Sequence, residues 1–122
     1  MTWTYKQSTG EILHNGRVIG RGYAGKNGGK NNPAMQSVSA TGPLPQGFYT
    51  IIGHPFTHPH TGAYSIRLQP SSGNIMFGRS GFLIHGDSRN HPGDASDGCI
   101  VLARHIREVI WNSGDMRLEV IK

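Results

Sequence analysis

The chain has 122 residues, with 12 lysines and arginines against 7 aspartates and glutamates, a formal net charge of +5 and one cysteine. This length predicts one domain over residues 1–122 with a core of its own. A single cysteine excludes an internal disulfide. The positive charges are scattered along the chain, which disfavours nucleic acid as a partner. No window approaches the roughly 18 apolar residues of a membrane span and the N-terminus does not resemble a signal peptide, so we expect synthesis in the cytoplasm.

Short strands joined by tight turns are predicted for most of the chain, because 18 glycines and 7 prolines interrupt it. The strongest turn signal is Asn15-Gly16, where both residues tolerate a positive φ and so form a two-residue hairpin turn. The polar run at residues 25–33 predicts a loop that either borders a cleft or is a plain connector. In chain order, the predicted strands are residues 3–7, 11–13, 17–23, 48–52, 64–68, 75–77, 82–84 and 116–121.

One helix is predicted, over residues 103–112. Ile106, Val109 and Ile110 recur there at helical spacing, and Gly114 is a suitable C-terminal stop. Cys99 is therefore expected in the turn just before the helix. Unpaired amides and the positive end of a helix dipole favour a thiolate at such a position. The expected fold is mainly β, with one helix after the cysteine.

Cys99 and His85 are the candidate catalytic pair. Cys99 follows Ser-Asp-Gly, which is a poor stretch of packing surface, and His85 ends the apolar strand predicted at residues 82–84. A neighbouring imidazole can hold or generate a nucleophilic thiolate, so this pair is the minimum for covalent acyl transfer. A lone cysteine is more often an inert core residue, and that interpretation stays open on the cysteine alone.

The two motifs resemble those of the L,D-transpeptidases (YkuD-like enzymes), in which a His-Gly step precedes Ser/Thr-His-Gly-Cys. The closer similarity is to the compact type VI secretion effectors of that superfamily, and it covers nearly the whole chain, including residues 42–51 and 78–87. Asp97 replaces the histidine that usually precedes Gly-Cys, and Val101-Leu102 stand where Asn or Arg often follows. Both departures fit the effector subgroup. The resemblance implies a β-sandwich or cradle that works as a cysteine enzyme without a cofactor.

The resemblance also implies a substrate and a place of action. The substrate would be the stem tetrapeptide of peptidoglycan, cleaved between meso-diaminopimelate and the terminal D-alanine, or altered by exchange of that D-alanine for another D-amino acid. The protein would be an antibacterial effector delivered to the periplasm of a target bacterium. A cognate immunity protein and a component of the secretion system would be its protein partners.

Acyl-transfer chemistry gives further roles to residues near the pair. The amides of Gly98 and Cys99 are candidates for the oxyanion hole. The second imidazole nitrogen needs an orienting acceptor, for which Asp87, Ser96 and a backbone carbonyl are candidates. Arg79, Ser80 and Asp97 are expected to line the cleft. Arg79 is either a ligand for a substrate carboxylate or a plain surface charge.

Two other functions stay open. A zinc-dependent cell-wall peptidase is conceivable, because three histidines form an H-x3-H-x-H pattern and His91 follows His85 closely. Prolines within the pattern exclude a helical ligand pair, and residues 55–62 are predicted to be an exposed loop. A non-catalytic basic module that binds cell wall or nucleic acid is the second alternative, and it leaves the two motifs unexplained. The three histidines are His54, His58 and His60.

Overall fold

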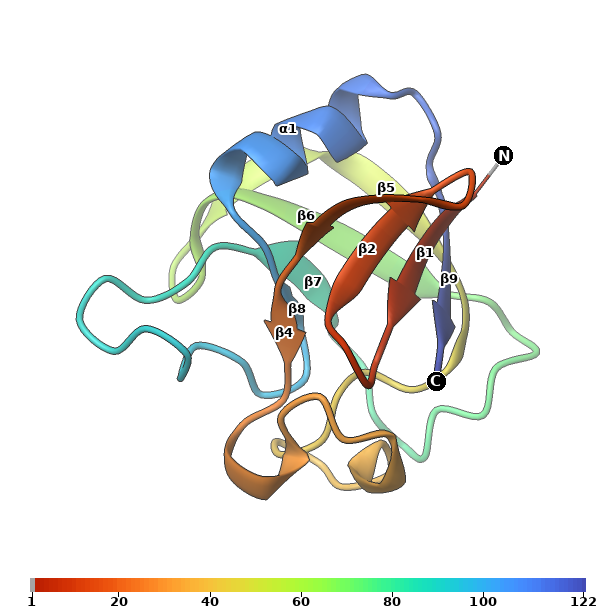
Figure 1. Cartoon of the computed structure of the whole chain (residues 1–122), viewed down its shortest axis with the longest axis vertical. Coiled ribbons are helices and arrows are strands. Elements are labelled where there is room, and N and C mark those ends of the chain that lie inside the picture. The colour runs from red at the N-terminus through yellow and green to blue at the C-terminus, as the bar shows by residue number, and fades with distance from the viewer. Residues whose placement is uncertain (1) are drawn as a thin grey trace.

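The computed structural model describes residues 2–122, and within this range it contains nine strands, one α-helix and two short 3-10 helices (Figure 1). The strands form one sheet in the order β3-β2-β1-β9-β5-β6-β7-β8-β4. The expectation of a mainly β fold with a helix after the cysteine is confirmed. The elements are β1 (Trp3–Lys6), β2 (Glu11–His14), β3 (Arg17–Arg21), β4 (Tyr23–Ala24), η1 (Asn27–Gly29), η2 (Pro33–Met35), β5 (Gly47–His58), β6 (Gly62–Pro70), β7 (Leu83–His85), β8 (Ile100–Val101), α1 (Arg104–Asn112) and β9 (Arg117–Ile121).

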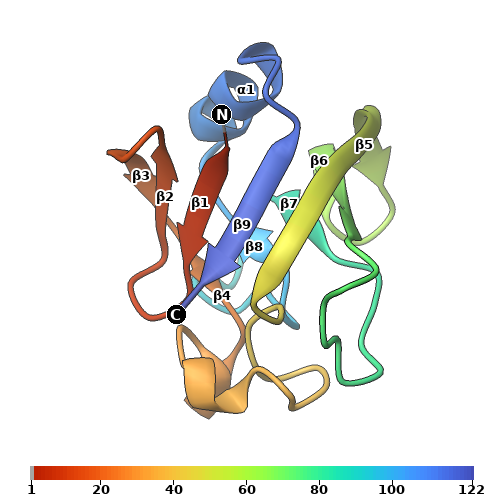
Figure 2. The ribbon, with the colours of Figure 1, turned by 90° about the vertical axis from the view of Figure 1, so that its right-hand side faces the viewer.

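The sheet curls toward closure, because its two outermost strands, β3 and β4, are separated in the chain by Gly22 alone. Figure 2 shows β1, β9 and β5 in front and β7, β8 and β4 behind, with α1 at one end and residues 25–43 at the other. The Gly22 amide donates to the carbonyl of Gly10 at 2.8 Å, and a Cβ at Gly22 would collide with the carbonyl oxygen of Val101. Only glycine permits so close an approach of two backbones.

The core fills the inside of the curled sheet. On β1 and β9 every second side chain is buried, as the alternating sequence pattern predicts for strands with one face inward. Helix α1 closes one end with Ile106 and Ile110. Within the described residues, no helix has the length and apolar character needed to cross a bilayer. Further core side chains are Trp3, Tyr5, Ile12, Leu44, Tyr49, Ile51, Ile66, Leu68, Ile84, Ile100, Leu118 and Val120.

Three predicted elements differ from the observed ones. The strand expected at residues 17–23 is broken at Gly22. Strand β5 continues to His58, through residues that were expected to form an exposed loop. Residues 75–77 form no strand, and the Ile75 side chain is exposed. The amide side chain of Asn74 explains this last difference, since it binds both the N–H and the carbonyl of Phe48, at 3.0 and 2.8 Å, where a strand would have paired through its backbone.

Helix α1 is fixed to the sheet by a buried arginine. Arg107 donates from Nε to the carbonyl of Leu102 at 3.1 Å, and from Nη1 to the carbonyls of Ala63 and Tyr64 at 3.0 and 2.8 Å. These carbonyls lie on the chain just before the helix and at the start of β6. The guanidinium thus satisfies main-chain acceptors at the point where the helix meets the β5–β6 hairpin.

Tyr5→Phe is expected to raise the free energy of unfolding by about 1 kcal/mol, because the Tyr5 hydroxyl is buried and has no hydrogen-bond partner among residues 2–122. Tyr49→Phe is the matched control. The Tyr49 hydroxyl is buried but donates to the carbonyl of Pro45 at 2.7 Å, so its removal should lower the free energy of unfolding by about 1 kcal/mol. Urea unfolding of both variants measures the two shifts; shifts of the same sign would contradict the prediction.

Candidate active site

His85 ends strand β7, and Cys99 directly precedes the neighbouring strand β8. Strands β7 and β8 are parallel, with His85 opposite Val101, and Cys99 lies two residues before Val101. The Cys99 Sγ accepts a hydrogen bond from the Leu83 amide at 3.3 Å. The bond to the Leu83 amide places Sγ beside β7, and Leu83 lies two residues before His85 on that strand.

The position of Cys99 relative to the helix was predicted wrongly. Strand β8 lies between them, and α1 begins only at Arg104. No helix N-terminus is therefore available to hold a thiolate. Burial raises the pKa of the Cys99 thiol; the negative charge of Asp97 acts in the same direction, whereas the amide of Leu83 opposes it. The resting form of the residue is the thiol.

His85 is buried at 2% exposure, and a backbone carbonyl orients its ring. The Nδ1 atom is 2.7 Å from the carbonyl oxygen of Gly86. A carbonyl oxygen only accepts, so Nδ1 carries the hydrogen and Nε2 of the neutral ring is left to take a proton. Burial lowers the pKa of His85, and the nearby positive charge of Arg107 lowers it further. The pair therefore rests as a neutral thiol and a neutral imidazole.

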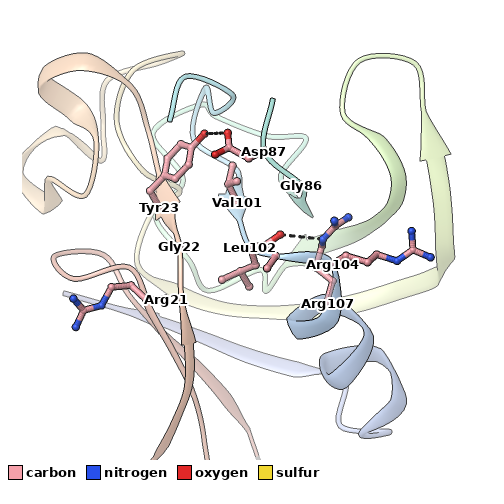
Figure 3. Close-up of a pocket in the computed structure, with 10 residues that line it drawn as sticks. Arg21, Gly22, Tyr23, Gly86, Asp87, Val101, Leu102, Arg104 and Arg107 are labelled. Carbon is pink, nitrogen blue, oxygen red and sulfur yellow. Dashed lines mark hydrogen bonds between the residues drawn. The ribbon is translucent and has the colours of Figure 1, made fainter. Parts of the chain in front are cut away.

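Asp87 is engaged elsewhere. Its carboxylate accepts from the Tyr23 hydroxyl at 2.6 Å (Figure 3) and from the amides of Ser88 and Gly93 at 2.8 and 3.1 Å. The same Tyr23 oxygen accepts from the Ala95 amide at 2.9 Å. These bonds fix the loop between His85 and Cys99 to β4. Of the three candidates for orienting the imidazole, the contacts favour the backbone carbonyl over Asp87.

A cavity of about 320 Å³ lies beside this contact, next to β4 and β8 (Figure 3). Its lining combines the Tyr23–Asp87 pair with backbone from β4 and β8. The Arg104 and Arg107 side chains border it from the start of α1, and Figure 3 shows the hydrogen bond from Arg107 to the Leu102 carbonyl. Both arginines are held by protein groups, since Arg104 pairs with Glu108 at 2.9 Å.

Ser96 organises the turn that carries the thiol. Its Oγ accepts from the amides of Gly25 and Gly98 at 2.8 and 3.0 Å, and it donates to the carbonyl of Cys99 at 2.6 Å. The Gly98 amide is thereby occupied, which removes it from the predicted oxyanion hole. The Cys99 amide is the remaining candidate. Gly98 is still required as glycine, because its φ is +139° and a Cβ would lie 2.5 Å from Nη2 of Arg79.

Arg79 has a structural role in place of the predicted contact with a substrate carboxylate. The side chain is 8% exposed. Its Nη1 donates to the carbonyls of Gln36 and Pro43 at 2.6 and 2.8 Å, and its Nη2 donates to those of Gly42 and Asp97 at 2.9 and 3.2 Å. Both terminal nitrogens thus join residues 36–43 to the turn before Cys99. Burial also lowers the pKa of this guanidinium.

Two cavities are lined by residues close to Cys99 in the chain or to its Leu83 contact. One, of about 300 Å³, is lined by His85 and by the loop after it. The other, of about 320 Å³, is lined by Asp97, Ser80, Phe82 and also Arg79. Phe82 directly precedes Leu83, whose amide contacts Sγ of Cys99, and His85 follows Leu83 by two residues. The predicted cleft residues Ser80 and Asp97 are both exposed at the second cavity.

The three histidines of the zinc alternative do not form a ligand set. His54 and His58 lie on β5, and the Nδ1 atom of His58 accepts from the amides of His60 and Thr61 at 3.0 and 3.3 Å. Among residues 2–122, no three His, Cys, Asp or Glu side chains are placed to hold a metal ion. His60 lines the cavity of His85 instead. Sequence reasoning missed this position, because only the long β5–β6 hairpin brings it there.

Comparison with known families identifies the domain. A family model described as the Tlde1 domain matches residues 19–122, a range that includes both His85 and Cys99. No curated protein matches the sequence.

Proposed function

The chain belongs to the Tlde1 domain family of L,D-transpeptidase-like effectors of type VI secretion, and from this premise we propose that it is a cysteine enzyme acting on peptidoglycan stem tetrapeptides. One observation supports the cysteine chemistry most directly. The imidazole of His85 is fixed by the Gly86 carbonyl with Nε2 available, on the strand next to Cys99. An oriented imidazole with a free nitrogen close to a thiol is what general-base activation of a nucleophile requires.

In the first half-reaction, the Cys99 sulfur attacks the carbonyl between diaminopimelate and the terminal D-alanine. Nε2 of His85 takes the thiol proton as the carbon–sulfur bond forms. The Cys99 amide donates to the negatively charged oxygen that develops. The carbon–nitrogen bond then breaks, and His85 returns the proton to the departing amine of D-alanine. The product is a thioester between the stem peptide and Cys99.

In the second half-reaction, a nucleophile resolves the thioester. Water gives the shortened peptide, which is carboxypeptidase activity, and the amine of another D-amino acid gives the exchanged peptide. His85 accepts a proton from the nucleophile, and that proton passes to the departing sulfur, so the neutral pair is restored. A resting thiol suits this cycle, because a proton transfer accompanies each bond change.

The test of this function is digestion of purified muropeptides, followed by mass analysis of the products. We expect the tetrapeptide to lose one alanine, and to gain the mass of an added D-amino acid when one is supplied. Pentapeptides and tripeptides serve as comparison substrates in the same digest. Unchanged tetrapeptide under all conditions would refute the proposal.

The proposed site of action is the periplasm of a target bacterium, where the stem peptides are found. Delivery there by type VI secretion fits the family, and a cognate immunity protein would protect the producing lineage. Directing the protein to the periplasm of a test bacterium should then be toxic. The Cys99→Ala form, directed in the same way, is the control that links toxicity to catalysis.

We expect kcat/KM to fall on the acid side only below pH 6.5, which is the ordinary pKa of a histidine side chain. Burial lowers the pKa of His85, so the imidazole stays neutral and able to accept a proton as the pH falls through that value. The rate should decline only at lower pH, where the buried ring is protonated. A kcat/KM profile on tetrapeptide between pH 4 and pH 8 measures this. An acid limb above 6.5 would show that the ring is more easily protonated than its burial implies.

A further inference from the structure

An exposed ion pair lies next to the nucleophile. Lys26 Nζ is 2.9 Å from the carboxylate of Asp97, two residues before Cys99, and the two side chains are 38% and 74% exposed. Exposed pairs of this kind contribute at most about 1 kcal/mol to folding. The turn is already fixed without it, by the bond from the Gly25 amide to Ser96 and by Arg79. The fold therefore has little need of these two charges.

Asp97 of this pair does not share a cavity with His85. Asp97 and Phe82 line one cavity, and His85 lines a different one. His85 must deliver a proton to the leaving amine, so the departing D-alanine belongs in the His85 cavity. The residue that supplies the acyl group then extends toward Asp97. In the proposed substrate that residue is diaminopimelate.

We propose, on the basis of the function proposed above, that Asp97 and Lys26 bind the distal end of the diaminopimelate side chain. That end carries an ammonium and a carboxylate on one carbon. The Asp97 carboxylate takes the ammonium and the Lys26 ammonium takes the carboxylate. Each protein charge exchanges its present partner for one on the substrate, so no charge is left unpaired. Ser80, exposed at the same cavity, adds a hydroxyl for hydrogen bonding.

The same contact connects substrate binding to the thiol. The negative charge of Asp97 contributes to the raised pKa of the Cys99 thiol. An ammonium bound at Asp97 offsets that charge, so the thiol gives up its proton more easily when the correct side chain is present. Asp97 is then a specificity-determining residue that also affects the nucleophile. Its removal should have opposite effects on peptide affinity and on the reactivity of the free thiol.

The test is equilibrium binding to the Cys99→Ala protein, measured by calorimetry with four synthetic tetrapeptides. Their third residues are meso-diaminopimelate, its form amidated at the distal carboxyl, lysine and norleucine. We expect the diaminopimelate peptide to bind about tenfold more tightly than the amidated and lysine peptides, and these about tenfold more tightly than the norleucine peptide. Adding Asp97→Asn should remove the advantage of the ammonium, and adding Lys26→Met should remove only that of the carboxylate.

Matched controls are Glu108→Gln and Lys6→Met, which remove the same charges elsewhere and should leave the ranking unchanged. In protein that retains Cys99, Asp97→Asn should speed alkylation by iodoacetamide several-fold. Equal affinity for the four peptides, no measurable binding, or equal losses for all four in both variants would overturn the proposal. Turnover of the same peptides by the wild-type protein is scored separately. Ranked binding without turnover would refute the enzymatic function alone, and turnover without ranked binding would refute the subsite alone.

Discussion

Cys99→Ala is expected to reduce processing of stem tetrapeptides by at least about 10⁴-fold, because no other described side chain is placed to form the thioester. The fold loses the weak bond from the Leu83 amide to Sγ and the packing of one sulfur atom against the core. The free energy of unfolding should therefore change by no more than about 1 kcal/mol. Mass analysis of muropeptides measures the activity, and urea unfolding measures the stability.

His85→Ala should cause a loss of the same order, and the double variant should be no worse than either single one. The two residues act as one unit, so their effects on the rate should not add. His91→Ala is the matched control, since His91 is exposed on the loop between the two residues and should keep wild-type activity. Residual wild-type turnover by folded Cys99→Ala protein would contradict the mechanism.

Arg79→Met is expected to lower the free energy of unfolding by about 3 kcal/mol. The guanidinium binds four main-chain carbonyls, and methionine would leave these acceptors without their donors. Lysine should rescue little, because one ammonium cannot reproduce the geometry of two terminal nitrogens. Thermal and urea unfolding of both variants measure the loss.

The control for Arg79 is Arg67→Met on β6, where the side chain is exposed and rests over the Phe56 ring. Its removal should change the free energy of unfolding by no more than about 0.5 kcal/mol. A similarly small effect at Arg79 would mean that water can replace its four contacts. In that case residues 36–43 would be held mainly by other groups, and the carboxylate-binding role first predicted for Arg79 would regain support.

Local patterns predicted most of the strands and the helix. Alternation marked β1 and β9, the Asn15-Gly16 turn marked the first hairpin, and the spacing of Ile106 and Ile110 marked α1. The errors have one physical source, which is that long-range contacts overrode local signals. Strand β5 continues through Pro55 because β6 pairs with it as far as His58, with irregular register. The strand expected at 75–77 is replaced by a loop held to Phe48 through the Asn74 side chain.

The sequence allowed the residues of the candidate site to be proposed, but not their hydrogen bonds. The motifs identified His85 and Cys99, and the chain order alone could not reveal that the imidazole binds the Gly86 carbonyl. The same applies to Gly98, whose amide is occupied by Ser96, and to Arg79, three of whose four partners come from a segment more than thirty residues away. Buried polar groups find partners wherever the fold brings them. A sequence pattern shows which chemical groups are present, but not which of them already have a partner.

The placement of β9 has a consequence for how this protein is made. Strand β9 is formed by Arg117–Ile121, yet it lies inside the sheet, between β1 from the start of the chain and β5. Until those residues are available, β1–β3 have no strand to join them to β5, and the two halves keep open edges. Such distant pairing makes folding a late event in synthesis. A nascent or truncated chain that lacks residues 117–121 should therefore be unfolded, with the facing edges of β1 and β5 unpaired.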